Sequence, residues 1–284
     1  MDITEKAEKE TYIDALIYTL QKGINFTEIA LGYGHGQSLR LFQRAFNESK
    51  ISREDLFLTH SLYPRDLPSM EVIEQDVADF YGTMKTDYAD STLVTQSLLM
   101  KFGDMPIYSL LHRLLETKKT RYVSLSNASP KGIRAFKKEF GNSFIAHEGH
   151  LSFEVRALQE KGVFNVCDEL NVKNIIWRPL RRNKTFQHDW KLLVEFAEKY
   201  QKTQGQIVLN WMCHLGYHPM VMSTSKEHID RNIESTSFSM SKADYQRMTD
   251  WRPQNYDAPT VAWDSPDVDN SIVVLANEFE KHIK

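Results

Sequence analysis

Two periodicities alternate along the chain. Short apolar segments rich in β-branched and aromatic residues are followed by longer charged segments, in which apolar residues recur every three or four positions. The first pattern predicts buried strands, and the second predicts amphipathic helices. Seven strands are expected, at residues 24–30, 56–62, 90–96, 121–127, 144–150, 174–180 and 219–225.

Helices are predicted between these strands and in front of the first. Residues 11–23 place Tyr12, Leu16 and Leu20 on one face and end at a glycine, the usual residue just after a helix. Residues 203–216 begin with a threonine suited to an N-cap and also end at a glycine. Further helices are expected at residues 70–84, 106–119 and 190–201.

The alternation of strands and helices defines the expected fold class. Strands joined through helices are parallel, and the unbroken series points to one α/β domain over residues 1–284, a (β/α)8 TIM barrel. The strand count is one short of eight, and the first recognisable element is a helix. The barrel is therefore expected to lack its first strand, to be completed in an unusual way, or to continue in a segment that precedes this sequence.

A missing strand would leave two strand edges in need of partners, at Ile24 and at Pro219. The C-terminal segment 270–284, a second copy of the chain in a homo-oligomer, or residues absent from this sequence would cover them. As a helix, segment 270–284 carries four apolar residues on one face, Ile272, Leu275, Phe279 and Ile283. This face predicts that the segment docks as a helix rather than pairing as a strand.

Candidate functional residues follow from the strand ends. In barrels of this kind, side chains that act on a ligand gather at the carboxyl ends of the strands. The residues at the predicted strand ends are Glu28, Tyr33, Ser61, Thr95, Ser126, Asn127, His147, Trp177 and the segment 223–232.

Composition narrows the classes of partner. The net charge is −3 and 41% of the residues are hydrophobic, which is typical of a globular protein with no nucleic-acid partner. The sequence begins without the apolar core of a signal peptide, and no segment approaches ~18 consecutive apolar residues, so membrane binding is not expected. Cys167 and Cys213 lack CxxC spacing, which favours free thiols in the cytoplasm and no metal site.

Six segments, from about Glu5 to about Trp251, resemble the aldo-keto reductase family. "GINFTEIALGYGHGQS" is similar to the segment with a catalytic aspartate and tyrosine, "REDLFLTHSLYP" to the strand of the catalytic lysine, and "KTDYADSTLVTQS" to that of the catalytic histidine. "TRYVSLSNASP" and "IIWRPLRRN" resemble strands that hold the nicotinamide, and "VMSTSKEHIDRN" the segment that holds the adenosine 2′-phosphate. The resemblance implies a barrel that reduces a small-molecule carbonyl substrate with NADP(H).

The catalytic positions depart from the family pattern. Tyr33 matches the tyrosine, whereas Glu28, Ser61 and Thr95 stand at the aspartate, lysine and histidine positions. A tyrosine with a pKa near ~10 is a weak acid at neutral pH unless a nearby cation lowers that pKa. Ser61 supplies no charge, and an ionised Glu28 would raise the pKa of Tyr33. Weakened or rewired carbonyl reduction is therefore expected.

Two histidines are candidates for a rewired site. His147 stands where the family has a glutamine that binds the nicotinamide carboxamide, and its imidazole would donate that hydrogen bond or exchange a proton near Glu28 and Tyr33. His60 precedes Ser61 in its strand. It is expected to face the helices, unless a one-residue bulge turns it into the barrel.

The nicotinamide and diphosphate positions are better matched. Ser126 and Asn127 supply polar groups for a carboxamide, and Trp177 offers a flat face to a nicotinamide ring. After Trp177 comes a basic cluster suited to a diphosphate, which contains Arg178, Arg181, Arg182 and Lys184.

The last segment favours NADP(H) over NAD(H). It places hydroxyl groups and a lysine just ahead of a helix, where backbone N–H groups attract a phosphate. Asn232 matches the adenine-side asparagine of the family, and Arg231 replaces an acidic residue. The phosphate-binding residues are Ser223, Thr224, Ser225 and Lys226.

Three functions remain open from the sequence. The first is an NADP(H)-dependent oxidoreductase with Tyr33 as acid. The second is a catalytically inactive protein that binds the cofactor or serves as a scaffold. The third is an isomerase or lyase that uses Glu28, Tyr33 and His147 for proton transfer, because one barrel fold hosts many chemistries.

Overall fold

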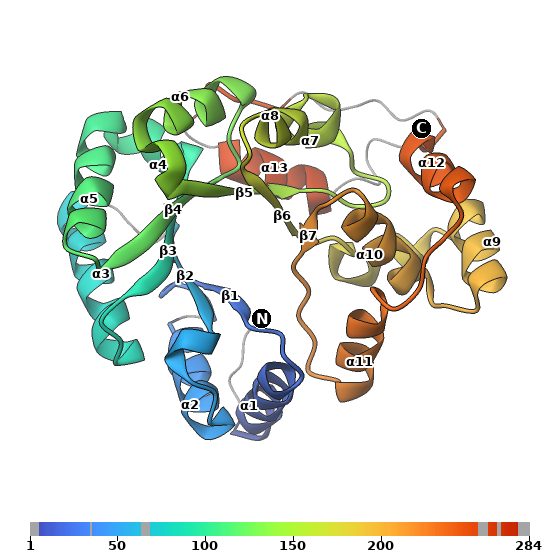
Figure 1. The fold of residues 1–284 in the computed structure, drawn as a ribbon, viewed down its shortest axis with the longest axis horizontal. Coiled ribbons are helices and arrows are strands. Elements are labelled where there is room, and N and C mark those ends of the chain that lie inside the picture. Colours follow the sequence, from blue (N-terminus) through green and yellow to red (C-terminus); the bar gives the residue numbers. More distant parts are fainter. Residues whose placement is uncertain (1–5, 35, 64–68, 255–260, 266–267, 278–284) are drawn as a thin grey trace. The chain divides into compact units, whose positions relative to one another are not determined.

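The computed structural model describes residues 6–34, 36–63, 69–254, 261–265 and 268–277 (Figure 1). It contains two compact units. The first comprises residues 1–126, 138–145 and 223–226, and the second comprises residues 127–137, 146–222 and 227–284. That all 284 residues form a single domain remains a prediction.

The first unit alternates strands and helices. Its elements are α1 (Lys6–Gln21), β1 (Phe26–Ile29), α2 (Ser38–Ser49), η1 (Arg53–Asp55), β2 (Phe57–Leu62), α3 (Met70–Met84), β3 (Ala89–Thr95), α4 (Gln96–Phe102), α5 (Asp104–Glu116), β4 (Thr120–Ser126) and η3 (Gly141–Ser143). The strands β1 to β4 pair in sequence order and are parallel.

Alternate residues of these strands face opposite sides, which fixes where the core and the site lie. Ile29 and Leu58 belong to a buried apolar cluster with Phe42 of α2 and Phe80 of α3. In Figure 1, α2 and α3 lie on that side of β1 and β2. Because strand neighbours point to opposite faces, Glu28 projects from the other side.

The second unit continues the pattern. Its elements are α6 (Pro130–Phe140) and β5 (Phe144–His150), which both extend into the first unit, then α7 (Ala157–Glu160), α8 (Val163–Glu169), β6 (Lys173–Trp177), η4 (Arg181–Gln187), α9 (Lys191–Tyr200), α10 (Gln204–His214), β7 (His218–Pro219), α11 (Lys226–Glu234), α12 (Lys242–Asp250) and α13 (Val268–Asn277). The strands β5, β6 and β7 are parallel and pair in that order.

Seven strands were expected, and the described residues contain seven. Helix α3 has the predicted bounds, and Thr203 caps α10 in a capping box with Gln206. The last strand is shorter than predicted: residues 219–225 were expected, but β7 covers His218–Pro219 only. Pro219 has no N–H to donate to a neighbouring strand, and the ladder ends one residue later, where the Met220 N–H donates to the Ile176 carbonyl.

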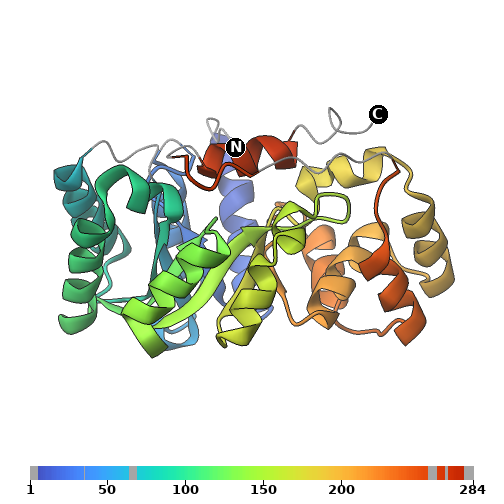
Figure 2. The same ribbon diagram turned by 90° about the horizontal axis from the view of Figure 1, so that it is seen from above.

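Residues 270–277 of the C-terminal segment are helical, as the apolar face predicts. Ile272 and Leu275 are buried along α13, which is drawn in red in Figure 2. Phe279 and Ile283, the other two residues of the predicted face, lie outside the described residues. The cover for the edges at Ile24 and Pro219 remains a prediction.

Candidate active site and cofactor-binding residues

Tyr33 and Glu28 are in direct contact. The Tyr33 hydroxyl donates to the Glu28 carboxylate, 3.1 Å from Oε1 and 3.4 Å from Oε2. Glu28 comes from β1, and Tyr33 from the glycine-rich turn after it. The Tyr33 N–H closes the turn by donating to the Ala30 carbonyl oxygen (3.2 Å), and Gly34 continues the chain in a left-handed conformation (φ +58°). The predicted glutamate–tyrosine pair is therefore present, with Tyr33 38% exposed.

The Glu28 carboxyl group has a perturbed proton affinity. Its loss of hydration raises the pKa to about 7, and hydrogen bonds from Ser61 and Tyr33 oppose that shift. Ser61 is buried and neutral, so no cation stands beside the pair at this position. A carboxyl group with this pKa exchanges its proton readily near neutral pH, which suits a general acid or base.

Thr95 has a structural role in the described contacts. Its Oγ1 accepts from the Leu98 N–H (3.2 Å) as the N-cap of α4 and lies 2.9 Å from the Ser97 hydroxyl. The side chain is fully buried. Ser126, paired with Thr95 in the sheet register, is also buried and ends β4.

His60 faces the helices, as strand alternation predicts. Its Nε2 lies 2.8 Å from Asp76 Oδ1 of α3, and its ring stacks on Phe80 at 4.0 Å. The ladder of β2 with β1 runs without a bulge, since Ile29 pairs with His60 and Glu28 with Thr59. The alternative that His60 turns into the site is therefore wrong.

His147 lies on the helix side of β5, which corrects its predicted role. Its Nε2 accepts from the Ala128 N–H at 3.1 Å, and a Cβ added at Gly149 would meet the His147 ring, Leu158 of α7 and Phe164 of α8 at 3.1 Å. Burial lowers the pKa of His147 to about 3. Its acceptor nitrogen Nε2 is occupied and its ring faces the helix layer, so it is not placed to act as a base at the strand ends. The other nitrogen, Nδ1, has no hydrogen-bond partner among the described residues, and a hydrogen bond from His147 to a carboxamide stays a prediction.

Asn127 and Trp177 do come together. The Trp177 indole N–H donates to Asn127 Oδ1 (3.1 Å), and the ring of His150 lies 4.7 Å from the indole. The Arg178 guanidinium lies 5.5 Å from the centre of the same indole. Asn127 and Trp177, two of the residues predicted to contact the nicotinamide, thus form one cluster in the second unit.

The residues predicted to hold the cofactor also carry unusual backbone conformations. Asn127, Arg178 and Arg181 have φ angles of 52°, 50° and 46°. Left-handed backbone is uncommon for arginine, and such residues are enriched at ligand-binding sites.

Arg181 is held by a buried carboxylate. Its Nη1 donates to Glu154 Oε1 (2.7 Å), and neither side chain has access to solvent. Thr185 donates to the other carboxylate oxygen at 3.1 Å. Glu154 was not predicted as a site residue, although a charged residue within the apolar segment "LSFEV" was a signal, since a buried charge requires a partner.

Four of these polar side chains donate to α13. Asn127 Nδ2 lies 2.9 Å from Asp269 Oδ1, and Arg181 Nε lies 2.7 Å from the Ala276 carbonyl oxygen. Two further donors reach the last residue of α13. Arg178 Nη1 lies 2.7 Å from Asn277 Oδ1, and Lys184 Nζ lies 2.9 Å from the Asn277 carbonyl oxygen.

The predicted phosphate segment begins α11. Ser223, Thr224 and Ser225 are half-buried, and the Ser225 N–H donates to Ser223 Oγ at 3.1 Å. Lys226, which belongs to the first unit like Tyr18, lies 5.2 Å from the centre of the Tyr18 ring. The structure therefore places these hydroxyl groups at the start of a nine-residue helix, as the sequence predicts.

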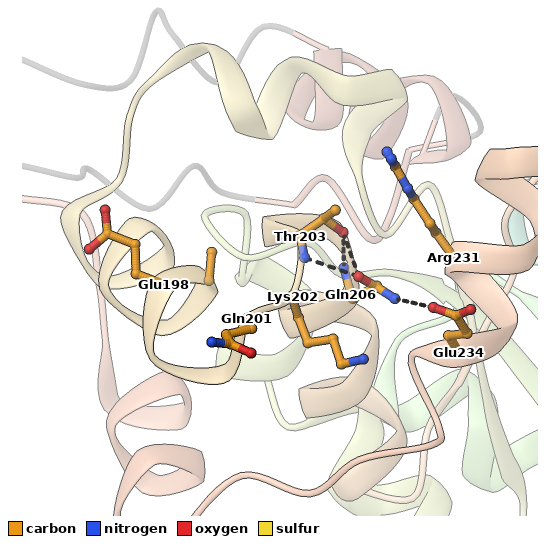
Figure 3. A pocket seen from close by; sticks show the side chains of 8 residues that line it. Glu198, Gln201, Lys202, Thr203, Gln206, Arg231 and Glu234 are labelled. Atoms are coloured by element: carbon orange, nitrogen blue, oxygen red, sulfur yellow. Dashed lines mark hydrogen bonds between the residues drawn. The ribbon is translucent and has the colours of Figure 1, made fainter.

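Asn232 is half-buried on α11 beside Arg231, which forms an ion pair with Glu227. Arg231 lines a polar hollow of about 520 Å³ between α9, α10 and α11 (Figure 3). In this hollow Gln206 accepts from Thr203 and donates to Glu234.

Five side chains of the second unit carry the types of chemical group that bind a nicotinamide dinucleotide. An amide, a flat indole and three cations are the groups that would contact a carboxamide, a nicotinamide ring and a diphosphate. They belong to Asn127, Trp177, Arg178, Arg181 and Lys184.

The described residues contain no group of three or more His, Cys, Asp or Glu side chains arranged to hold a metal ion. Likewise, none of the described helices is both long and apolar enough to cross a bilayer.

The fold is that of an α/β barrel. A solved aldo/keto reductase from Klebsiella pneumoniae, in complex with NADP and acetate, superposes with a TM-score of 0.75 at 17% identity, over 92% of each chain. Two relatives by sequence are an uncharacterized oxidoreductase of Caenorhabditis elegans (24% identical, over 86% of this chain and 75% of the relative) and an NADPH-dependent D-xylose reductase of Meyerozyma guilliermondii (22%, over 86% and 87%).

The sequence model of the Aldo/keto reductase family matches residues 2–252. The chain belongs to this family.

Proposed function

We propose that the protein is an NADP(H)-dependent oxidoreductase that interconverts a small-molecule carbonyl compound and its alcohol, and that Glu28 takes the place of a cation beside Tyr33. The observation that carries this proposal is the 3.1 Å contact between the Tyr33 hydroxyl and the Glu28 carboxyl group. The similarity to NADPH-dependent and NADP-bound relatives supports the cofactor. The free thiols of Cys167 and Cys213 are in keeping with a cytoplasmic location.

Reduction of a carbonyl group requires a hydride at carbon and a proton at oxygen. The reduced nicotinamide, when bound, supplies the hydride. Tyr33 supplies the proton, because it is the most exposed hydroxyl-bearing residue of this cluster, whereas Ser61 is buried. When Glu28 is protonated, its O–H donates to the Tyr33 oxygen, and the Tyr33 O–H is directed at the substrate oxygen instead of at Glu28. As the Tyr33 O–H bond breaks, the Glu28 carboxyl group transfers its own proton to the tyrosine oxygen.

This relay explains how the site works without a lysine. Tyr33 ends each proton transfer as a neutral phenol, so no tyrosinate has to be stabilised by a cation. Glu28 ends as a carboxylate, which the hydroxyl groups of Tyr33 and Ser61 stabilise by hydrogen bonds. Solvent then returns the proton, and the reverse steps operate in alcohol oxidation.

The proposal assigns the cofactor contacts to this chain's residues by their chemistry. Ser126 and Asn127 orient the carboxamide, and Trp177 provides the face for the ring. Cations bind the diphosphate, and the start of α11 with Asn232 binds the adenosine end. The cations are Arg178, Arg181 and Lys184, and the phosphate-binding residues of the α11 start are Ser223, Thr224, Ser225 and Lys226.

The test is NADPH oxidation with a panel of small aldehydes. Tyr33→Phe removes the proton donor and should lower the rate by ~10²–10⁴. Tyr88→Phe removes the same hydroxyl group from a tyrosine whose ring lies against Arg53, and should leave the rate unchanged. Equal turnover in the Tyr33→Phe variant and the wild type would falsify the assignment.

A catalytically inactive cofactor-binding protein is the second candidate. The contacts that favour it are the use of Thr95 as a helix cap and the donation of Asn127, Arg178 and Arg181 to α13. This candidate predicts NADPH binding with no oxidation of NADPH by any aldehyde of the panel. Tyr33-dependent turnover with one aldehyde rules it out.

A further inference from the structure

Helix α13 is amphipathic, and its polar contacts are concentrated at its two ends. Val268, Ile272, Leu275 and Ala276 are buried, while Val274 is 37% exposed. At its start, the Asp269 carboxylate accepts from Asn127. At its end, the oxygens of Ala276 and Asn277 accept from Arg178, Arg181 and Lys184.

The acceptors of α13 are oxygen atoms that carry full or partial negative charge, as are the diphosphate and carboxamide oxygens of a dinucleotide. The last carbonyl groups of a helix carry partial negative charge and have no partner within the helix. Here three cations donate to the oxygens of two consecutive residues, as cations do to the oxygens of a diphosphate. The Asp269 carboxylate occupies the amide N–H of Asn127, where a carboxamide oxygen would accept.

The contacts of Arg181 favour an anion as the group that would replace the end of α13. Glu154 and the Ala276 carbonyl oxygen share its guanidinium, which has no access to solvent. When α13 leaves, the guanidinium keeps the Glu154 carboxylate and loses the Ala276 carbonyl oxygen, whose place a phosphate oxygen can take. A phosphate oxygen is a stronger acceptor than the carbonyl group it would replace.

We propose that α13 occupies the dinucleotide site of the resting protein and that NADPH binds by displacing it. The inference rests on the proposed function, because it takes the dinucleotide as the ligand of Asn127, Arg178 and Arg181. Since only the fraction of molecules with α13 displaced is competent to bind, the docked helix lowers the apparent affinity for NADPH by that fraction.

The first measurement uses the unmodified chain. Amide hydrogen exchange of residues 268–277 is followed with and without saturating NADPH. Displacement predicts that exchange in α13 accelerates at least about tenfold when NADPH binds. Unchanged protection of α13 at saturating NADPH overturns the proposal, because helix and nucleotide then occupy different places.

The second measurement compares two substitutions on opposite faces of the same helix. Ile272→Asp buries a charge and undocks α13, whereas Val274→Asp adds the same charge on the exposed face. By titration of tryptophan fluorescence, Ile272→Asp should bind NADPH about tenfold more tightly than the wild type, and Val274→Asp should match the wild type. Asp269→Ala, which removes the contact with Asn127 and introduces no buried charge, should shift the affinity in the same direction and guards against misfolding of Ile272→Asp.

The two proposals fail in different ways. If Ile272→Asp, Asp269→Ala and the wild type bind NADPH equally, α13 is no competitor and the oxidoreductase function stands. If α13 exchanges rapidly in Ile272→Asp and yet no NADPH binds to it, the cofactor assignment is wrong and the displacement proposal is wrong with it.

Discussion

The Arg181 guanidinium and the Glu154 carboxylate lie 2.7 Å apart, and both side chains are fully shielded from solvent. The pair fixes the donor that reaches the end of α13 through Arg181 Nε. Because Thr185 also donates to Glu154, the carboxylate is satisfied on both oxygens. The Glu154 carboxylate therefore holds the Arg181 guanidinium in place inside the second unit. The pair does not lie at the protein surface.

Removal of this carboxylate should be costly. Glu154→Ala leaves the Arg181 charge buried without its counter-ion and should lower the free energy of unfolding by about 3–5 kcal/mol. Glu160→Ala is the matched control, since it breaks the half-exposed ion pair with Arg252 and should cost about 0–1 kcal/mol. Urea denaturation of both variants measures the difference. Similar values for the two would mean that Glu154 and Arg181 contribute no more than a surface pair.

The pKa of Glu28 predicts the pH profile of catalysis. The raised value of about 7 means that the carboxyl group is protonated below pH 7 and ionised above it. Carbonyl reduction needs the protonated form, so kcat should fall about tenfold per pH unit above pH 7, whereas alcohol oxidation should rise through the same range. Glu28→Gln cannot relay a proton, and its lower kcat should not change near pH 7. A wild-type profile that is flat between pH 6 and 9 contradicts the relay.

Thr95 should act on stability and not on turnover. Thr95→Ala removes the cap from α4 and should lower the free energy of unfolding by about 0.5–2 kcal/mol. Thr95→Ser keeps the accepting oxygen and should stay close to the wild type. Thermal unfolding and kcat are measured on both variants. A loss of kcat in Thr95→Ala without a loss of stability would instead place the hydroxyl group in the chemistry.

Gly34 controls the turn that carries Tyr33. A Cβ at Gly34 would lie 2.5 Å from Ser38 Oγ, so Gly34→Ala should force that hydroxyl away from its hydrogen bond with Tyr12. Gly141 has a similar φ (+52°), but nothing lies within 4 Å of an added Cβ. Both substitutions should cost about 1–2 kcal/mol for the backbone alone, and Gly34→Ala about 1 kcal/mol more for the hydrogen bond. Denaturant titration of the two variants tests the difference, and equal costs would show that Ser38 adapts freely.

The local pattern of apolar and polar residues was sufficient to predict most of the secondary structure. The 3.6-residue period of residues 70–84 and the threonine before α10 predicted a helix and a cap that the structure contains. Strand alternation also placed His60 correctly against Asp76 and Phe80. These features depend on neighbours in sequence or on one adjacent helix, so the sequence determines them.

Contacts between residues that lie far apart in the sequence could not be predicted from this pattern. His147 was expected at the strand ends, but its ring lies on the face of β5 that packs against α7 and α8. The apolar face of α13 predicted docking, yet nothing in the pattern identified Asn127 as the partner of Asp269, 142 residues away. Such contacts depend on which surfaces the fold brings together, and periodicity carries no record of that.

The number of residues between the two partners of such a contact has a consequence during protein synthesis. Arg181 and its acceptor at Ala276 are separated by 95 residues. At roughly 5–20 residues per second, a ribosome needs on the order of 5–20 s to add that stretch. During this interval the nascent chain already contains the basic cluster but not the helix that covers it. Arg181 therefore spends this interval without the acceptor that α13 provides.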